Sequence, residues 1–160
     1  MIVKVLSRDD CLMIDGIKYH HHINGGGLIA ETAKVADTVF VGPFAVVSGY
    51  VTISGQVKVN DNVRVSEKAV ICEYASISGN AVVSGSPKIS GHSRIFGNVV
   101  IKGCPEITDN ARISDNAEIS GNTKVCKNAR IYGSAKVSGN SKIGGNASIS
   151  IGSWNNASKT

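Results

Sequence analysis

The chain has 160 residues, of which 42% are hydrophobic, and its 17 Lys and Arg against 12 Asp and Glu give a formal net charge of +5. This composition excludes a disordered chain, and no apolar run approaches the roughly 20 residues of a membrane helix. The start lacks the long apolar segment of a signal peptide, and four cysteines are too few for a disulfide scaffold. We therefore expect a soluble cytoplasmic protein.

Residues 1–27 are expected to form an N-terminal cap. Apolar residues 11–14 and residues 17–23 flank Asp15-Gly16, a pair typical of the type I′ turn of a β-hairpin, and residues 2–6 are a further candidate strand. Such a hairpin would cover the strand edges of the next segment, which otherwise invite pairing with another chain.

Three consecutive histidines lie in this cap, at His20, His21 and His22. Around a threefold axis they could trap a metal ion, but adjacent strand residues point to opposite faces, so at most two per chain would converge. Surface histidines are the favoured interpretation, and no metal site is predicted.

A repeat fills the rest of the chain: residues 28–153 divide into 21 consecutive hexads without an insertion. The second position is Ile or Val in all 21, and the sixth is always small or short. Gly occupies the fourth position eleven times and Asn the fifth position nine times.

This pattern predicts a triangular prism of short parallel strands. Positions six and two share one strand face, so their apolar side chains point inward. Gly at position four and Asn at position five tolerate left-handed backbone, which places a bend at the end of each hexad. Three sides make a turn of 18 residues, so the repeat gives seven coils. Asn62, Asn80, Asn98 and Asn116 then stack in a column whose amides can hydrogen bond.

The pattern [IV]-x-[GD]-N-[AS]-x resembles the hexapeptide repeat of left-handed parallel β-helices, the acyltransferase-like superfamily. Its regular GNA repeats resemble phage and bacterial hexapeptide-repeat proteins, and residues 25–43 resemble their first coil. The resemblance implies an all-β fold, a left-handed parallel β-helix with an N-terminal β-hairpin cap, and a homotrimer.

The repeat is predicted to end at residue 153. Asn155 falls where the next inward aliphatic residue is due, so residues 154–160 are expected to be a C-terminal tail. Trp154 is expected to cover the last coil.

The first side of the prism carries an apolar stripe at its outward first position, formed by Leu28, Val46, Val82 and Val100. Monomers rarely expose such a stripe, which predicts a subunit interface. Scattered surface valines are the alternative.

The third side is the best candidate ligand site. Arg94, Arg112 and Arg130 occupy its first position on consecutive coils, where like charges repel unless an anion lies among them. The aromatic and histidine residues predicted to lie beside them are Tyr74, His92, Phe96 and Tyr132. Arginines and aromatic rings suit a planar anion such as a nucleotide, bound at a cleft between subunits. The alternative is a solvated cationic face with Asp109 or Asp115 as local partners.

Three functions remain open. The favoured one is a non-catalytic homotrimer that sequesters a small anionic, nucleotide-like ligand; the phage resemblance suggests counter-defence in the host cytoplasm. A structural or assembly scaffold is the second. The third is the coenzyme A-dependent acyl transfer known in the superfamily, with His92 as general base because it is the only histidine in the repeat. The absence of loop insertions argues against this enzyme. No cofactor and no membrane partner is predicted. Dedicated nucleic-acid binding is not predicted either, because the charge is spread along the sequence and no recognised DNA- or RNA-binding motif is present.

Overall fold

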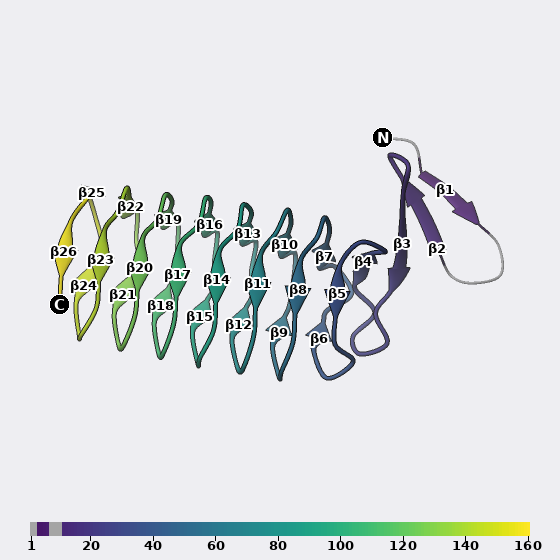
Figure 1. Ribbon diagram of the computed structural model, residues 1–160, viewed down its shortest axis with the longest axis horizontal. Coiled ribbons are helices and arrows are strands. Elements are labelled where there is room, and N and C mark those ends of the chain that lie inside the picture. Colours follow the sequence, from purple (N-terminus) through teal and green to yellow (C-terminus); the bar gives the residue numbers. More distant parts are fainter. Residues whose placement is uncertain (1–2, 7–10) are drawn as a thin grey trace.

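The computed structural model describes residues 3–6 and 11–160 and shows an all-β parallel solenoid of seven coils (Figure 1). Three sheets of 11, 8 and 7 strands run along its axis, and from β4 to β23 each strand pairs with the strand three further along the chain. We call them the first, second and third sheets. The described part of the chain has no helix that could cross a lipid bilayer.

The N-terminal strands form the predicted antiparallel hairpin. β2 (Cys11–Ile14) pairs with β3 (Ile17–His21) across Asp15 and Gly16, whose φ angles of 48° and 80° are those of a type I′ turn. β1 (Val3–Leu6) adds to β2; residue 2 of the predicted strand lies outside the described residues. β3 then pairs antiparallel with β4, so this hairpin continues the first sheet (Figure 1).

The coil strands are nearly all two residues long. Those of the first sheet are β4 (Leu28–Ala30), β7 (Val46–Val47), β10 (Arg64–Val65), β13 (Val82–Val83), β16 (Val100–Ile101), β19 (Glu118–Ile119), β22 (Lys136–Ser138) and β25 (Ser153–Asn155). Those of the second sheet are β5 (Lys34–Val35), β8 (Thr52–Ile53), β11 (Val70–Ile71), β14 (Lys88–Ile89), β17 (Glu106–Ile107), β20 (Lys124–Val125), β23 (Lys142–Ile143) and β26 (Ser158–Lys159). Those of the third sheet are β6 (Phe40–Val41), β9 (Lys58–Val59), β12 (Ser76–Ile77), β15 (Arg94–Ile95), β18 (Arg112–Ile113), β21 (Arg130–Ile131) and β24 (Ser148–Ile149).

The core is the interior of the prism, filled by positions two and six as predicted. From Val41 to Ile149 every second-position side chain is at most 2% exposed. Polar residues at the sixth position differ in how they are satisfied. The Ser141 hydroxyl contacts the backbone of Ser138, Trp154 and Ala157, whereas the buried Ser93 hydroxyl has no partner among the described residues.

Within the hexads, left-handed backbone occurs at the fourth position and, in the last hexad, at Gly152 in the fifth. None of the fifth-position Asn residues takes it, so the expectation that they share this role was wrong. The fourth-position residues with positive φ are glycines and non-glycine residues such as Asp61 and Asp109, with φ of 56° and 60°. From Gly49 to Gly145 one left-handed residue turns each corner. The fifth-position Asn side chains instead stack between coils, and the predicted ladder is present, with the Nδ2 of Asn62 donating to the Oδ1 of Asn80 at 3.1 Å and so on to Asn116.

The coil continues beyond the predicted end at residue 153. β25 pairs with β22, placing Trp154 opposite Val137, and β26 pairs with β23. The spacing between Trp154 and Val137 is 17 residues instead of 18, so the last coil is one residue shorter than the others where it returns to the first sheet. The indole thereby takes the inward place that Asn155 would have occupied, and Trp154 packs half-buried against the core as the expected cover.

Candidate functional site

The outward side chains of the third sheet form a cationic face without acids. Its strands alternate inward and outward residues, so the first and third positions of each hexad face outward. At the first position these residues are Phe40, Lys58, Ser76, Arg94, Arg112, Arg130 and Ser148. At the third position they are Gly42, Asn60, Ser78, Phe96, Ser114, Tyr132 and Ser150. We call this surface the third face.

Three open hollows follow one another along the third face. The first, of about 660 Å³, is lined by Phe40 and Lys58 among others; the second, of about 510 Å³, shares Lys58 and Gln56 with it. The third, of about 270 Å³, shares Phe96 with the second. Because neighbouring hollows share lining residues, they lie in a row along the third face, and we call this row the trough.

All seven predicted ligand-binding residues line the trough. Tyr74, His92, Arg94 and Phe96 line the second hollow, while Phe96 also lines the third. The remaining three line the third hollow: Arg112, Arg130 and Tyr132. Phe96 therefore stands between the two groups. Ligand binding by these residues stays a prediction.

Tyr74 and His92 stack as the 18-residue spacing predicts. They follow β11 and β14 at the corner that leads into the third sheet, and their ring centroids lie 4.8 Å apart with an interplanar angle of 8°. Tyr74 remains 54% exposed. The pair therefore presents a planar wall at the edge of the second hollow.

The arginine column, Arg94, Arg112 and Arg130, lies in direct register on β15, β18 and β21. Their strands are neighbours at the usual spacing of about 4.8 Å. The ion pairs found among the described residues do not involve any of the three guanidinium groups, which are solvent-exposed. The column is thus uncompensated positive charge.

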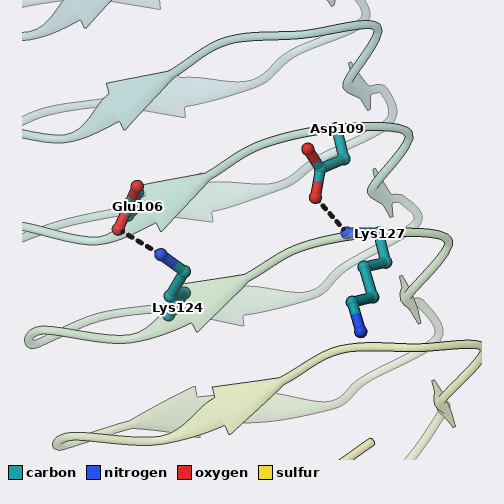
Figure 2. Close-up of polar contacts among 4 residues, drawn as sticks. All are labelled: Glu106, Asp109, Lys124 and Lys127. Atoms are coloured by element: carbon teal, nitrogen blue, oxygen red, sulfur yellow. Dashed lines mark hydrogen bonds and ion pairs between the residues drawn. The ribbon is translucent and has the colours of Figure 1, made fainter.

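The predicted local partners of the arginines, Asp109 and Asp115, are engaged elsewhere. The Asp109 carboxylate accepts a hydrogen bond from the Lys127 amide one coil on, at 2.7 Å (Figure 2), and Asp115 accepts one from the Gly133 amide at 2.9 Å. Both residues occupy the left-handed fourth position of a corner, from which the carboxylate reaches along the axis to the next amide.

The first and second sheets form ion pairs between outward residues of neighbouring strands. In the second sheet Lys124 pairs with Glu106 at 3.0 Å (Figure 2), and in the first sheet Lys136 pairs with Glu118 at 2.9 Å. The hydrogen bond and the negative charge of Glu106 raise the pKa of Lys124. In these two ion pairs a cation lies beside an anion, whereas in the arginine column of the third sheet a cation lies beside a cation.

Tyr132 lines the third hollow. Hydrogen bonding with the Ser148 hydroxyl, and then with that of Ser150, lowers the pKa of the Tyr132 phenol, and the charge of Arg130 acts in the same direction. The ring remains 39% exposed, so it can both stack on a planar ligand and offer its hydroxyl.

Comparison of the sequence with known protein families gives no match, and no curated protein is significantly similar to it. What the structure establishes is a parallel β-solenoid built from a hexapeptide repeat. Function must therefore be argued from the surface itself.

Among the trough residues that the sequence did not single out are Phe40, Gln56 and Lys58. The signal was available, because Phe40 and Lys58 occupy the same outward column as the arginines. Gln56 precedes Tyr74 by 18 residues in the corner column. They were missed because the predicted site was built on the three consecutive arginines, and Ser76 separates Lys58 from Arg94 in that column.

The predicted interface stripe on the first side is only partly covered within the chain. Leu28, Val46 and Val100 are half-buried and Val82 is 37% exposed. Two aromatic residues that the sequence did not single out extend this apolar surface: Phe44 is 72% exposed and Tyr50 is 70% exposed. They stand at the corners on either side of Val46, in the fifth position where Asn is otherwise common. Their role in an interface stays a prediction.

The N-terminal histidines make local contacts. The expectation of surface histidines holds for His20 and His21 but was wrong for His22, whose ring is buried. The Nε2 of His22 lies 2.9 Å from the Val39 carbonyl oxygen, and the Nδ1 of His21 lies 2.7 Å from that of Gly26. In the described part of the chain no three His, Cys, Asp or Glu side chains gather as metal ligands. Burial raises the pKa of the Cys72 thiol, which disfavours the reactive thiolate.

Proposed function

We propose that this protein is a non-catalytic homotrimeric binding protein whose third face takes up a small, planar, anionic ligand of nucleotide type. The observation that carries the proposal is the arginine column, which is uncompensated on an acid-free face while matching coils of the other sheets form ion pairs. A protein that places three arginines in register without partners pays a repulsive cost in its free state. A bound anion removes that cost.

The chemistry of the face fits a phosphate attached to a ring. A guanidinium group offers a planar fork that hydrogen bonds two oxygens of one phosphate, and neighbouring arginines multiply the attraction. Phe96 and the stacked Tyr74–His92 pair supply flat surfaces for a base within the same hollow as Arg94. The proposal assigns no nucleophile to the third face, so the protein binds the ligand without a chemical reaction.

Assembly is part of the proposal. The first side carries apolar residues with Phe44 and Tyr50 exposed at its corners, and burying these against other copies would remove a wet hydrophobic surface. A left-handed homotrimer of the acyltransferase-like type would bring the third face of each chain to a cleft between subunits. Sequestration of a signalling nucleotide, as in phage counter-defence, is the physiological role we propose.

The test is calorimetric titration of the purified protein with purine and pyrimidine mononucleotides. We expect binding by the parent protein, loss of binding by Arg112→Gln, and unchanged binding by Lys88→Gln. Lys88 is a matched control because it is an exposed first-position cation of the second sheet without an ion pair to a described residue. Native mass spectrometry of both variants checks for the trimer. Failure of every nucleotide to bind contradicts the proposal and favours a scaffold.

Acyl transfer is the second candidate because His92 lines the second hollow next to Arg94. Its ring is stacked on Tyr74, and the hollow is open to acceptors. Consumption of acetyl-coenzyme A by the parent protein and its loss in His92→Gln would establish the enzyme. Absence of turnover together with nucleotide binding would establish the binding protein.

A further inference from the structure

We propose that the ligand of the trough is a short single-stranded oligonucleotide rather than a mononucleotide. This inference rests on the proposed function and specifies its ligand class. It departs from the expectation of no dedicated nucleic-acid binding, because cations that are spread along the sequence lie in one column of the fold. The first argument is length. The hollows run from Phe40 on β6 to Ser148 on β24, the first and last strands of the third sheet. Six coil steps at about 4.8 Å give a trough about 29 Å long.

The second argument is the distribution of charge. The arginine column spans two coil steps, about 10 Å, and Lys58 lies a further two steps from Arg94. A mononucleotide that reaches one or two of these cations leaves the others uncompensated. A chain of phosphates reaches all four, and no Asp or Glu occupies an outward first or third position of the third sheet.

The third argument is the distribution of flat side chains. Phe40 lines the first hollow, the Tyr74–His92 pair the second, and Tyr132 the third, with Phe96 between the last two. Single-strand-binding proteins combine a cationic groove with aromatic rings on which successive bases stack, and every base has a face to offer. A row of rings beside a row of cations matches that combination.

The aromatic rings favour a single-stranded nucleic acid over other linear anions. An acidic polysaccharide satisfies the cations but has no planar group to stack. A nucleic-acid duplex presents phosphates, but its bases are already stacked on one another and are not available to side chains. The single strand uses both features of the trough.

The experiment measures the affinity of the full-length protein for thymidine monophosphate and for end-labelled oligothymidylates of increasing length by fluorescence anisotropy and competition. Affinity is expected to rise with length up to about four nucleotides, the lower end of known single-strand sites. The slope of log affinity against log salt is expected to approach about −3 for four neutralised phosphates, against about −0.7 for one.

Variants assign the contacts. Lys58→Gln is expected to reduce the salt slope for the longer strands by about 0.7 and to weaken tetranucleotide binding more than mononucleotide binding. Phe96→Leu is expected to weaken strand binding about 5- to 100-fold, the contribution of one stacked base. Lys88→Gln on the second sheet is the matched control and should change neither quantity. Circular dichroism confirms that each variant is folded.

The outcomes separate the two proposals. If the mononucleotide binds as tightly as the longer strands, the proposed function stands and the oligonucleotide inference is overturned. If neither binds, both fail. If a sulfated oligosaccharide binds as tightly as the tetranucleotide and Phe96→Leu leaves strand binding unchanged, the ligand class is wrong. Length dependence that is lost with Lys58→Gln supports the inference.

Discussion

Replacing Arg112 with Gln is expected to make the free protein more stable while it abolishes anion binding. Arg112 lies in register between Arg94 on one neighbouring strand and Arg130 on the other, and it has no ion pair among the described residues. Gln keeps a polar, unbranched side chain, shorter than that of Arg, but removes its charge. Both repulsive contacts therefore disappear together.

The magnitude follows from the two contacts. Charged pairs directly opposite on neighbouring strands are worth about 0.2–1 kcal/mol, and exposure to solvent favours the lower half of that range. Two contacts give about 0.5–1 kcal/mol, or a rise of about 1–4 °C in the unfolding midpoint for a chain of this length. At 1 M salt the Debye length is about 3 Å, shorter than the strand spacing of about 4.8 Å, so the gain should vanish.

Thermal unfolding followed by circular dichroism at low and at high salt measures the effect. Glu118→Gln is the matched control, because it removes one partner of the Glu118–Lys136 ion pair in the first sheet. It should lower the midpoint at low salt, opposite in sign to Arg112→Gln. A lower midpoint for Arg112→Gln, or a gain that persists at 1 M salt, would refute the electrostatic reasoning.

Three further predictions concern the core, one corner and the third face. Ser93→Ala should raise the free energy of unfolding by about 1 kcal/mol because it removes a buried hydroxyl without a partner, whereas Ser141→Ala should lower it by a similar amount; equal signs in chemical denaturation would contradict this. Gly91→Ala should cost about 1–3 kcal/mol, since φ is +72° and the new Cβ would lie 2.6 Å from the backbone of Asp109; a neutral effect on denaturation would contradict it. The Tyr132 phenol should ionise below the pH of about 10 usual for tyrosine, and Tyr132→Phe should remove that step from the ultraviolet titration. Because its pKa is lower in the folded chain, this group adds stability above pH 10 and loses that contribution as pH falls through the folded pKa.

Much of the architecture could be predicted because the repeat has no insertion. A constant spacing of 18 residues fixes which side chains meet one coil apart, so the Asn62–Asn80 hydrogen bond and the stacking of Tyr74 on His92 both followed from counting. The same spacing placed the arginines in register. Periodicity determines neighbours across coils, and the strand alternation determines faces.

Details that depend on side-chain direction or on a change of register could not be predicted in this way. Counting placed Asp109 near the arginines, but the left-handed backbone at that position directs its carboxylate to the Lys127 amide. At the C-terminal end the spacing drops by one residue, and Trp154 enters the core in place of Asn155. Counting in a fixed six-residue repeat cannot predict a change in the length of the repeat.

Each coil of the prism touches only the coil before it and the coil after it, so the molecule behaves as a one-dimensional array of coupled units. In such an array the outer units fray first, and an inner unit opens only when an interface on each side is broken. Arg94, Arg112 and Arg130 belong to the fourth, fifth and sixth of the seven coils. The charged column is thus carried by interior units, where the backbone that spaces the guanidinium groups is protected from end fraying without any loop or disulfide to hold it.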